Sequence, residues 1–188
     1  MAKVYVFLAN GFEDVEALIP IDVLRRGGAE VVTVSIDNET TMVETAHGVT
    51  VLADALIGEC DLSDADLLIL PGGMPGASNL DASEEVRQAL LRQAEKGGRI
   101  AAICAAPMVL GGLNLLNGRR ATCYPGFETK LIGADYTAEL VTVDGNITTG
   151  EGPAAAFPFA YELLKQLCGS ETAHEIAVGM RYEHLMQR

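Results

Sequence analysis

The chain has 188 residues, of which 49% are hydrophobic and 21% charged, a globular composition that excludes the disordered and fibrous classes. Its 26 acidic and 13 basic side chains give a formal net charge of −13, which makes nucleic acids and anionic membranes poor partners. Because neither a signal peptide nor an apolar run of membrane-spanning length is visible, we expect a cytoplasmic protein with reduced thiols.

Short apolar runs alternate with segments of helical period in the first half of the chain. Helices are predicted at 13–26 and from 81 to about 96. Pro20 inside the first helix should kink it or mark a restart. Asp81-Ala82-Ser83-Glu84 is a capping-box variant that opens the second. Strands are predicted at 4–8, 31–36, 67–70 and 99–103, with a hairpin-like excursion at 40–52.

The later half of the chain is less regular. Asp144-Gly145 lies between two strand-like runs and predicts a hairpin over 140–149. Apolar residues from Ala156 to Leu167 predict a helix at about 153–168. Strands that alternate with helices imply a mainly parallel sheet covered on both faces. Such sheets bind ligands beyond the carboxyl ends of their strands, and the candidate functional residues follow those ends.

Cys104 has the most informative setting of the four cysteines, because the strand at 99–103 runs straight into it. Pro107 suits the first turn of a helix, so the sequence predicts a strand–turn–helix nucleophile elbow. Backbone N–H groups and a helix dipole would lower the pKa of this thiol and favour the reactive thiolate. The alternative is a buried cysteine that packs only as a small apolar side chain.

Two further groups of candidate residues are predicted at the same edge of the sheet as Cys104. Gly72 and Gly73 follow the strand at 67–70 and offer N–H groups to an oxyanion, or simply form a loop. Glu16 lies one turn into the first helix between apolar neighbours. A partly desolvated carboxyl biased toward its neutral form is one interpretation, and a favourable contact with the helix dipole is the other. No two cysteines have the spacing of a zinc site, so no metal is expected.

Five segments, in this order, resemble the ThiJ/PfpI superfamily over nearly the whole chain, in particular the branch of the human parkinsonism-associated deglycase. They are residues 11–16, 19–28, 68–73, 101–107 and 150–153. The run Ala-Ala-Ile-Cys-Ala-Ala-Pro with an upstream Leu-Pro-Gly-Gly is specific, whereas Pro-Gly-Gly alone would not be. The resemblance implies a flavodoxin-like α/β sandwich, one family domain over 1–188, and no cofactor.

The resemblance also implies roles for individual residues. Cys104 would be the reactive residue, and Glu16, protonated, would hydrogen-bond its sulfur. The remaining pocket residues would be Gly72, Gly73, Ala105, Tyr124 and Pro153. Tyr124 stands where many members have a histidine, and a phenol is the poorer base at neutral pH. Ala105 replaces the histidine of the protease-like branch, which disfavours peptidase activity, and no His-x-Glu sequence supports a glutamine amidotransferase.

Two basic positions are candidates for a pocket completed across a homodimer, the assembly that the resemblance implies. His47 stands where relatives place a basic residue near the dimer interface, and a solvated turn histidine is the alternative. Arg26 ends the first predicted helix, where it either satisfies the dipole or adds positive charge to the pocket.

Three functions remain open on this reading. The first is a cofactor-independent enzyme of glyoxalase or deglycase type, with a small aldehyde or glycated adduct as substrate. The second is an oxidative-stress sensor or chaperone-like protein whose Cys104 is oxidised to a sulfinate without turnover. The third is a binding module that holds a metabolite.

Overall fold

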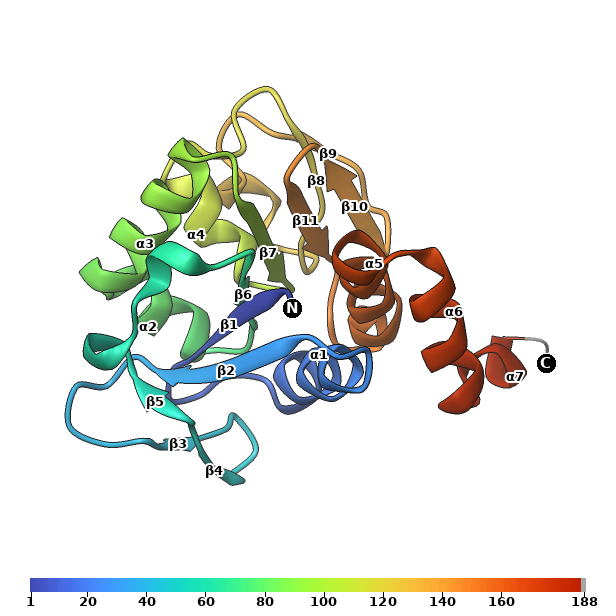
Figure 1. Ribbon diagram of the computed structural model, residues 1–188. Coiled ribbons are helices and arrows are strands. Elements are labelled where there is room, and N and C mark those ends of the chain that lie inside the picture. Colours follow the sequence, from blue (N-terminus) through green and yellow to red (C-terminus); the bar gives the residue numbers. More distant parts are fainter. Residues whose placement is uncertain (187–188) are drawn as a thin grey trace.

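The computed structural model describes residues 1–186 and is built on a seven-stranded sheet with helices on both sides (Figure 1). In spatial order the strands are β10 (Val141–Asp144), β11 (Ile147–Gly150), β7 (Arg99–Ile103), β6 (Leu67–Leu70), β1 (Lys3–Leu8), β2 (Glu30–Ser35) and β5 (Ala55–Leu56). Only β10 is antiparallel to its neighbour within this sheet. The predicted α/β class with a mainly parallel sheet is therefore confirmed.

The helices form the two outer layers of a flavodoxin-like sandwich. On one face α1 (Asp14–Arg26) packs against α5 (Ala156–Cys168), and α6 (Ser170–Gly179) and α7 (Tyr182–Met186) continue outward from α5 (Figure 1). The other face carries α2 (Gly76–Ala82), α3 (Glu84–Glu95) and α4 (Pro107–Gly112). None of the helices within 1–186 is both long and apolar enough to cross a membrane.

The central strands are mostly apolar after their first residues because helices cover both faces of the sheet. All four residues of β6 are buried, as are the last five of β1 and the last four of β7. α3 is amphipathic and buries Val86, Ala89 and Leu90 against this sheet. The parallel register brings the carboxyl ends of β1, β6 and β7 to one edge, which positions the candidate residues together.

Two local predictions need correction. α1 is a continuous helix with Pro20 buried inside it, so the proline does not mark a restart. The capping box at 81–84 is shifted, because α3 begins at Glu84 and the Ser83 hydroxyl accepts from the Val86 N–H at 3.3 Å. Asp81 instead belongs to α2.

Both predicted hairpins are present. β3 (Met42–Glu44) pairs antiparallel with β4 (Thr50–Leu52), and β10 pairs with β11 around the Gly145 turn. The predicted helix at about 153–168 is α5 preceded by the 3-10 turn η4 (Pro153–Ala155). The sequence pattern missed β5, β8 (Arg120–Ala121) and β9 (Asp135–Tyr136), and the 3-10 turns η1 (Ile57–Glu59), η2 (Leu62–Asp64) and η3 (Glu128–Lys130).

Candidate active site

Cys104 occupies a sharp turn immediately after β7. Its φ of 65° lies in the left-handed region that side chains other than glycine rarely adopt. The turn is held on both sides, because the Cys104 N–H donates to the Gly150 carbonyl at 2.9 Å and its own carbonyl accepts from the Tyr124 N–H at 2.8 Å. The side chain is 8% exposed. This strained, well-supported backbone has the geometry of the predicted nucleophile elbow.

Glu16 lies in the first turn of α1 and is fully buried. Its Oε2 accepts from the Gly72 N–H at 3.0 Å, and its carboxyl is hydrogen-bond coupled to the Cys104 thiol. Oε1 has no well-aligned protein partner among residues 1–186. The Glu13 carboxylate caps the helix by accepting from the Glu16 N–H at 2.9 Å. Glu16 therefore points inward to the thiol and leaves one oxygen for it or for a ligand.

The structure leaves no room for a side chain at position 72, between Glu16 and Cys104. A Cβ there would lie 2.6 Å from Glu16 Oε2 and 2.7 Å from the Cβ of Cys104, closer than atoms pack. The Gly72 N–H donates to Glu16 Oε2, so an oxyanion would compete with that carboxyl for it, and its role toward an oxyanion stays a prediction. Gly73 and Ala105 differ, since their N–H groups are directed at the Cys104 sulfur.

Burial is the main cause of the pKa shifts of Glu16 and Cys104. It raises the pKa of Glu16 to about 7, with the charge of Glu13 adding to the effect and the thiol and the Gly72 N–H opposing it. Burial and the neighbouring Glu16 raise the pKa of Cys104 to about 12, against the effect of the Gly73 and Ala105 N–H groups. The pKa shift of Cys104 is opposite to the sequence-based expectation. α4 has only six residues and does not offset the desolvation of the thiol.

The pair holds two protons below about pH 7 and one above it, because the pKa of Glu16 is about 7 and that of Cys104 is about 12. Two adjacent buried anions repel one another, so the form of the Glu16–Cys104 pair that holds one proton is either carboxylate with thiol or carboxyl with thiolate. Moving the proton from sulfur to Glu16 creates the nucleophile without adding charge to the site. The arrangement can thus deliver a thiolate at the moment of attack and store its proton on the carboxyl group.

A pocket of about 250 Å³ adjoins this turn, and the structure places the predicted residues Tyr124 and Pro153 in its wall. The Tyr124 side chain is 46% exposed, and its backbone N–H binds the carbonyl of Cys104. Glu151 also lines this pocket, although the sequence analysis assigned no site role to it. The sequence feature that could have indicated this role is a charged residue between Gly150 and Gly152, because neighbouring glycines leave its side chain unobstructed.

His47 and Arg26 are not next to the Cys104 sulfur within one chain. His47 Nδ1 lies 2.5 Å from Asp14 Oδ2, and this contact raises the pKa of the exposed imidazole. Arg26 pairs with Asp22 in the last turn of α1, and it lies about 15 Å along the helix from Glu16. Their approach across a dimer stays a prediction.

Within residues 1–186, one group has the spacing of metal ligands: Glu13, Asp14 and His47 offer oxygen and nitrogen atoms within 4.8 Å of one another. Each already has a structural role, because Glu13 caps α1 and Asp14 pairs with His47. The cluster also lies at the amino end of α1, where the helix dipole opposes a cation. These contacts explain the cluster without a metal ion.

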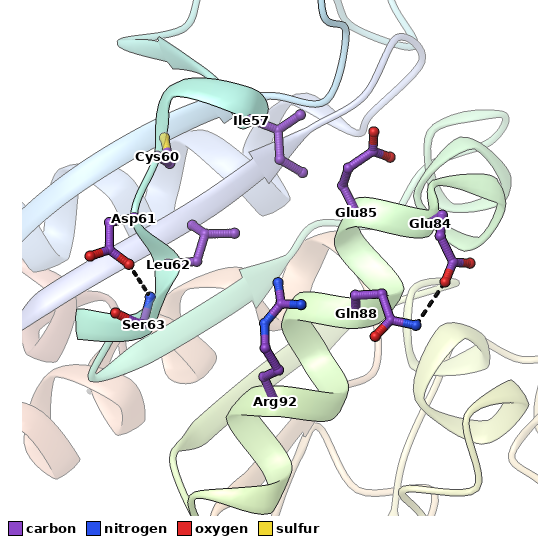
Figure 2. Close-up of a pocket in the computed structure, with 9 residues that line it drawn as sticks. All are labelled: Ile57, Cys60, Asp61, Leu62, Ser63, Glu84, Glu85, Gln88 and Arg92. Atoms are coloured by element: carbon purple, nitrogen blue, oxygen red, sulfur yellow. Dashed lines mark hydrogen bonds between the residues drawn. The ribbon is translucent and has the colours of Figure 1, made fainter.

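A larger cavity, about 500 Å³, lies between η1, η2 and the outer side of α3 (Figure 2). Its wall consists of Ile57, Cys60, Asp61, Leu62, Ser63, Glu84, Glu85, Gln88 and Arg92. Cys60 is half-buried there and its pKa is raised, mainly by desolvation. Neither Cys104 nor Glu16 lines this cavity, so its size does not make it the catalytic site.

Comparisons with known proteins identify the family and agree with the fold. The model of the DJ-1/PfpI family matches residues 2–166. Protein DJ-1 homolog A of Arabidopsis thaliana is 39% identical over 177 residues, covering 93% of this chain but 45% of that protein, so the chain spans less than half of that relative. The glutathione-independent glyoxalase DJR-1.2 of Caenorhabditis elegans is 31% identical over 166 residues, which cover 87% of each chain. Oxidized DJ-1 of Toxoplasma gondii has a TM-score of 0.92 at 38% identity, covering 96% of this chain and 98% of that one. The chain belongs to the DJ-1/PfpI family.

Proposed function

We propose that this protein is a cofactor-independent, cysteine-dependent enzyme that converts small 2-oxoaldehydes to 2-hydroxy acids. The observation that carries the proposal is the buried Glu16–Cys104 pair, in which a proton carrier contacts a strained nucleophile. The name of the Caenorhabditis elegans relative supports the same class of reaction. Removal of early glycation adducts would use the same first step on a larger carbonyl compound.

The first step is addition to the aldehyde. The Cys104 sulfur forms a bond to the aldehyde carbon while its proton moves to Glu16, and the carbonyl π electrons move to oxygen. Glu16 then protonates that oxygen, which gives a hemithioacetal and restores the carboxylate. A Glu16 pKa of about 7 suits both transfers, because the group gives and takes a proton with little free-energy difference near neutral pH.

The second step moves a proton between two carbons. Glu16 moves the proton from the carbon bound to sulfur to the neighbouring carbonyl oxygen, which forms an enediol. It then moves the hydroxyl proton of the sulfur-bearing carbon to the neighbouring carbon. The product is a thioester of Cys104 with a 2-hydroxy acid. Water then adds to the thioester and the thiol leaves. The sum is one 2-oxoaldehyde plus one water giving one 2-hydroxy acid, with the enzyme unchanged.

Backbone donors would support the developing negative charge. The N–H groups of Gly73 and Ala105 point to the sulfur, and the attacking atom brings the substrate oxygen close to them. Tyr124 would border the substrate and need not act as a base, because Glu16 supplies the proton transfers. The absent family histidine is therefore compatible with turnover in this mechanism.

The test is methylglyoxal turnover by three proteins: the parent, Cys104→Ala and Cys123→Ala. We expect turnover to fall to the uncatalysed background in Cys104→Ala and to remain within about twofold in Cys123→Ala, which changes a buried thiol outside the pair. For the parent, kcat/KM should rise with pH through about 7 as Glu16 ionises. Turnover retained by Cys104→Ala would contradict the proposal.

A second candidate function is redox sensing at the same thiol. The observation that favours it is the pair of N–H groups, from Gly73 and Ala105, that would bind sulfinate oxygens. In the reaction, one thiolate and two molecules of hydrogen peroxide give one sulfinate and two molecules of water. The Toxoplasma gondii relative bears the word oxidized in its description, which concerns that protein alone.

Mass spectrometry after mild peroxide treatment tests this second function. We expect two added oxygens on the peptide with Cys104 and fewer in Glu16→Leu, which lacks the acid that would hydrogen-bond the sulfinate. Cys60, which is half-buried and has no backbone N–H donor to its sulfur among residues 1–186, serves as the internal control. Equal oxidation of Cys60 and Cys104 would exclude a dedicated sensor.

A further inference from the structure

Glu151 lines the pocket beside Cys104, and its carboxylate has no hydrogen-bond or ion-pair partner among residues 1–186. We propose that this carboxylate selects against carbonyl substrates that carry an anionic group and favours those with a cationic group near the reacting carbon. For turnover the inference rests on the proposed function. The charge selection itself can be measured at the thiol without any turnover.

The main chain ties this pocket to the nucleophile from two directions. Tyr124, on one wall, donates its N–H to the carbonyl of Cys104. Gly150, directly before the opposite wall, accepts the N–H of Cys104. Tyr124 and the segment 151–155 form the walls of the pocket, and in the proposal a molecule approaches the sulfur between them. Glu151 is half-buried at this point, where water screens a charge less than on an open surface.

Two carboxylates lie near this pocket, Glu151 in its wall and Glu128 close by. Glu128 lies on the same side, because its carboxylate and that of Glu151 both act on the buried Cys123. Glu128 is held by the Gly126 N–H at 2.9 Å, which leaves Glu151 as the carboxylate without a partner. Of the described residues that form the pocket wall, none is a lysine, arginine or histidine. The other wall groups are small or apolar, apart from the Tyr124 hydroxyl.

This composition distinguishes substrates by charge more than by shape. A 2-oxoaldehyde with a carboxylate or phosphate would meet an unpaired anion, whereas an ammonium or guanidinium group would neutralise it. In a homodimer, the positive charge of Arg26 or His47 from a second copy would attract anionic substrates and so offset the effect of Glu151. Comparing Glu151→Gln with the parent isolates the carboxylate, because both proteins would form the same assembly.

Charged thiol reagents of matched size provide the direct test. Methanethiosulfonates with a trimethylammonium or a sulfonate group both form a mixed disulfide with Cys104 and release methanesulfinate. The rate of modification at Cys104 is followed by mass analysis of its peptide at fixed pH. We expect the cation-to-anion rate ratio to fall about tenfold in Glu151→Gln, since about threefold is expected for each unit charge some 6 Å away in a water-like dielectric.

Glu171→Gln is the matched control, because it removes the same charge from an exposed site on α6. Its rate ratio should equal that of the parent protein. High salt should reduce the ratio in the parent and have less effect in Glu151→Gln. An unchanged ratio in Glu151→Gln would overturn the proposal, because the carboxylate would then not act on molecules that approach Cys104.

Turnover gives the second measurement. We expect kcat/KM for 4,5-dioxopentanoate, an anionic 2-oxoaldehyde, to rise about threefold relative to methylglyoxal in Glu151→Gln. If the parent protein turns over neither compound, the proposed enzyme function fails while the reagent ratio still decides the charge selection. If both are turned over and Glu151→Gln leaves their ratio unchanged, the charge selection fails and the enzyme function stands.

Discussion

Cys104 and Cys123 are both buried, yet only the surroundings of Cys104 have the features of a reactive site. Burial is the main cause that raises both thiol pKa values, to about 12 at Cys104 and about 11 at Cys123. Cys123 faces only the added charges of Glu128 and Glu151. Cys104 faces two backbone N–H groups and is hydrogen-bonded to the carboxyl group of Glu16. The two thiols thus differ in the polar groups that converge on them, because desolvation raises both pKa values.

The largest difference between the two regions is Glu16, and Glu16→Gln removes it. We expect kcat/KM for methylglyoxal to fall about 100-fold or more, because an amide cannot carry the proton between sulfur, carbon and oxygen. Glu128→Gln, which changes a carboxylate on the Cys123 side, should retain activity within about threefold. Similar losses in both variants would indicate a general effect of negative charge.

Glu16 should also make folding stability depend on pH. Its pKa in the folded protein, about 7, exceeds the ordinary value of 4.5, so the folded state retains a proton that the unfolded state loses. The resulting stabilisation is complete below about 4.5 and is lost as the pH rises through 7, about 3 kcal/mol in total.

Denaturant unfolding at several pH values measures this dependence. The free energy of unfolding of the parent, relative to Glu16→Gln, should decline over that interval. Other groups titrate in both proteins, so the difference between the two curves isolates Glu16. Parallel curves would contradict a buried Glu16 with a raised pKa.

Gly72→Ala should disturb the pair by shape alone. Its Cβ would lie 2.6 Å from Glu16 Oε2, so the carboxyl or the Cys104 turn must move. We expect a loss of about 2 kcal/mol in unfolding free energy and about tenfold in kcat/KM. Gly152→Ala is the control in the pocket wall, where the added Cβ lies 3.1 Å from the movable Tyr124 ring. A fully active Gly72→Ala would show that the close contact is not needed.

Tyr124→Phe should have the smallest effect. Removing the hydroxyl leaves the Tyr124 N–H bond to Cys104 and the Glu16 pair unchanged, so kcat/KM should stay within about threefold of the parent. Tyr124→Ala, which also removes the ring from the pocket wall, separates shape from hydroxyl chemistry. A drop of tenfold or more in Tyr124→Phe would give the phenol a catalytic role.

The sequence predicts the long elements of this fold well because their patterns are strong. The apolar run Leu67–Leu70 and the periodic helix α5 each follow from burial against the sheet. The strands β5, β8 and β9 have two residues each, too few for an alternating pattern to appear. Ser83 became the helix cap instead of Asp81 because α2 already includes Asp81, a choice that depends on packing.

The candidate site is only partly readable from sequence. Cys104 stands out by its place between a strand and Pro107, and Glu16 by its apolar neighbours. The partner of the Gly72 N–H depends on main-chain orientation, which residue types do not specify. The direction of the Cys104 pKa shift depends on burial, and the pocket role of Glu151 on segments far apart in the chain. Both require three-dimensional contacts.

The left-handed backbone of Cys104 lowers folding stability at the position where the proposed function needs a cysteine side chain. A side chain at φ 65° costs about 1 kcal/mol, which glycine would not incur and asparagine would reduce. A library randomised at position 104 and selected only for folding should therefore return glycine and asparagine, whereas selection for carbonyl turnover should return cysteine. Position 104 is then a point where activity is retained at the expense of stability, and stabilising the protein without losing its chemistry requires changes elsewhere.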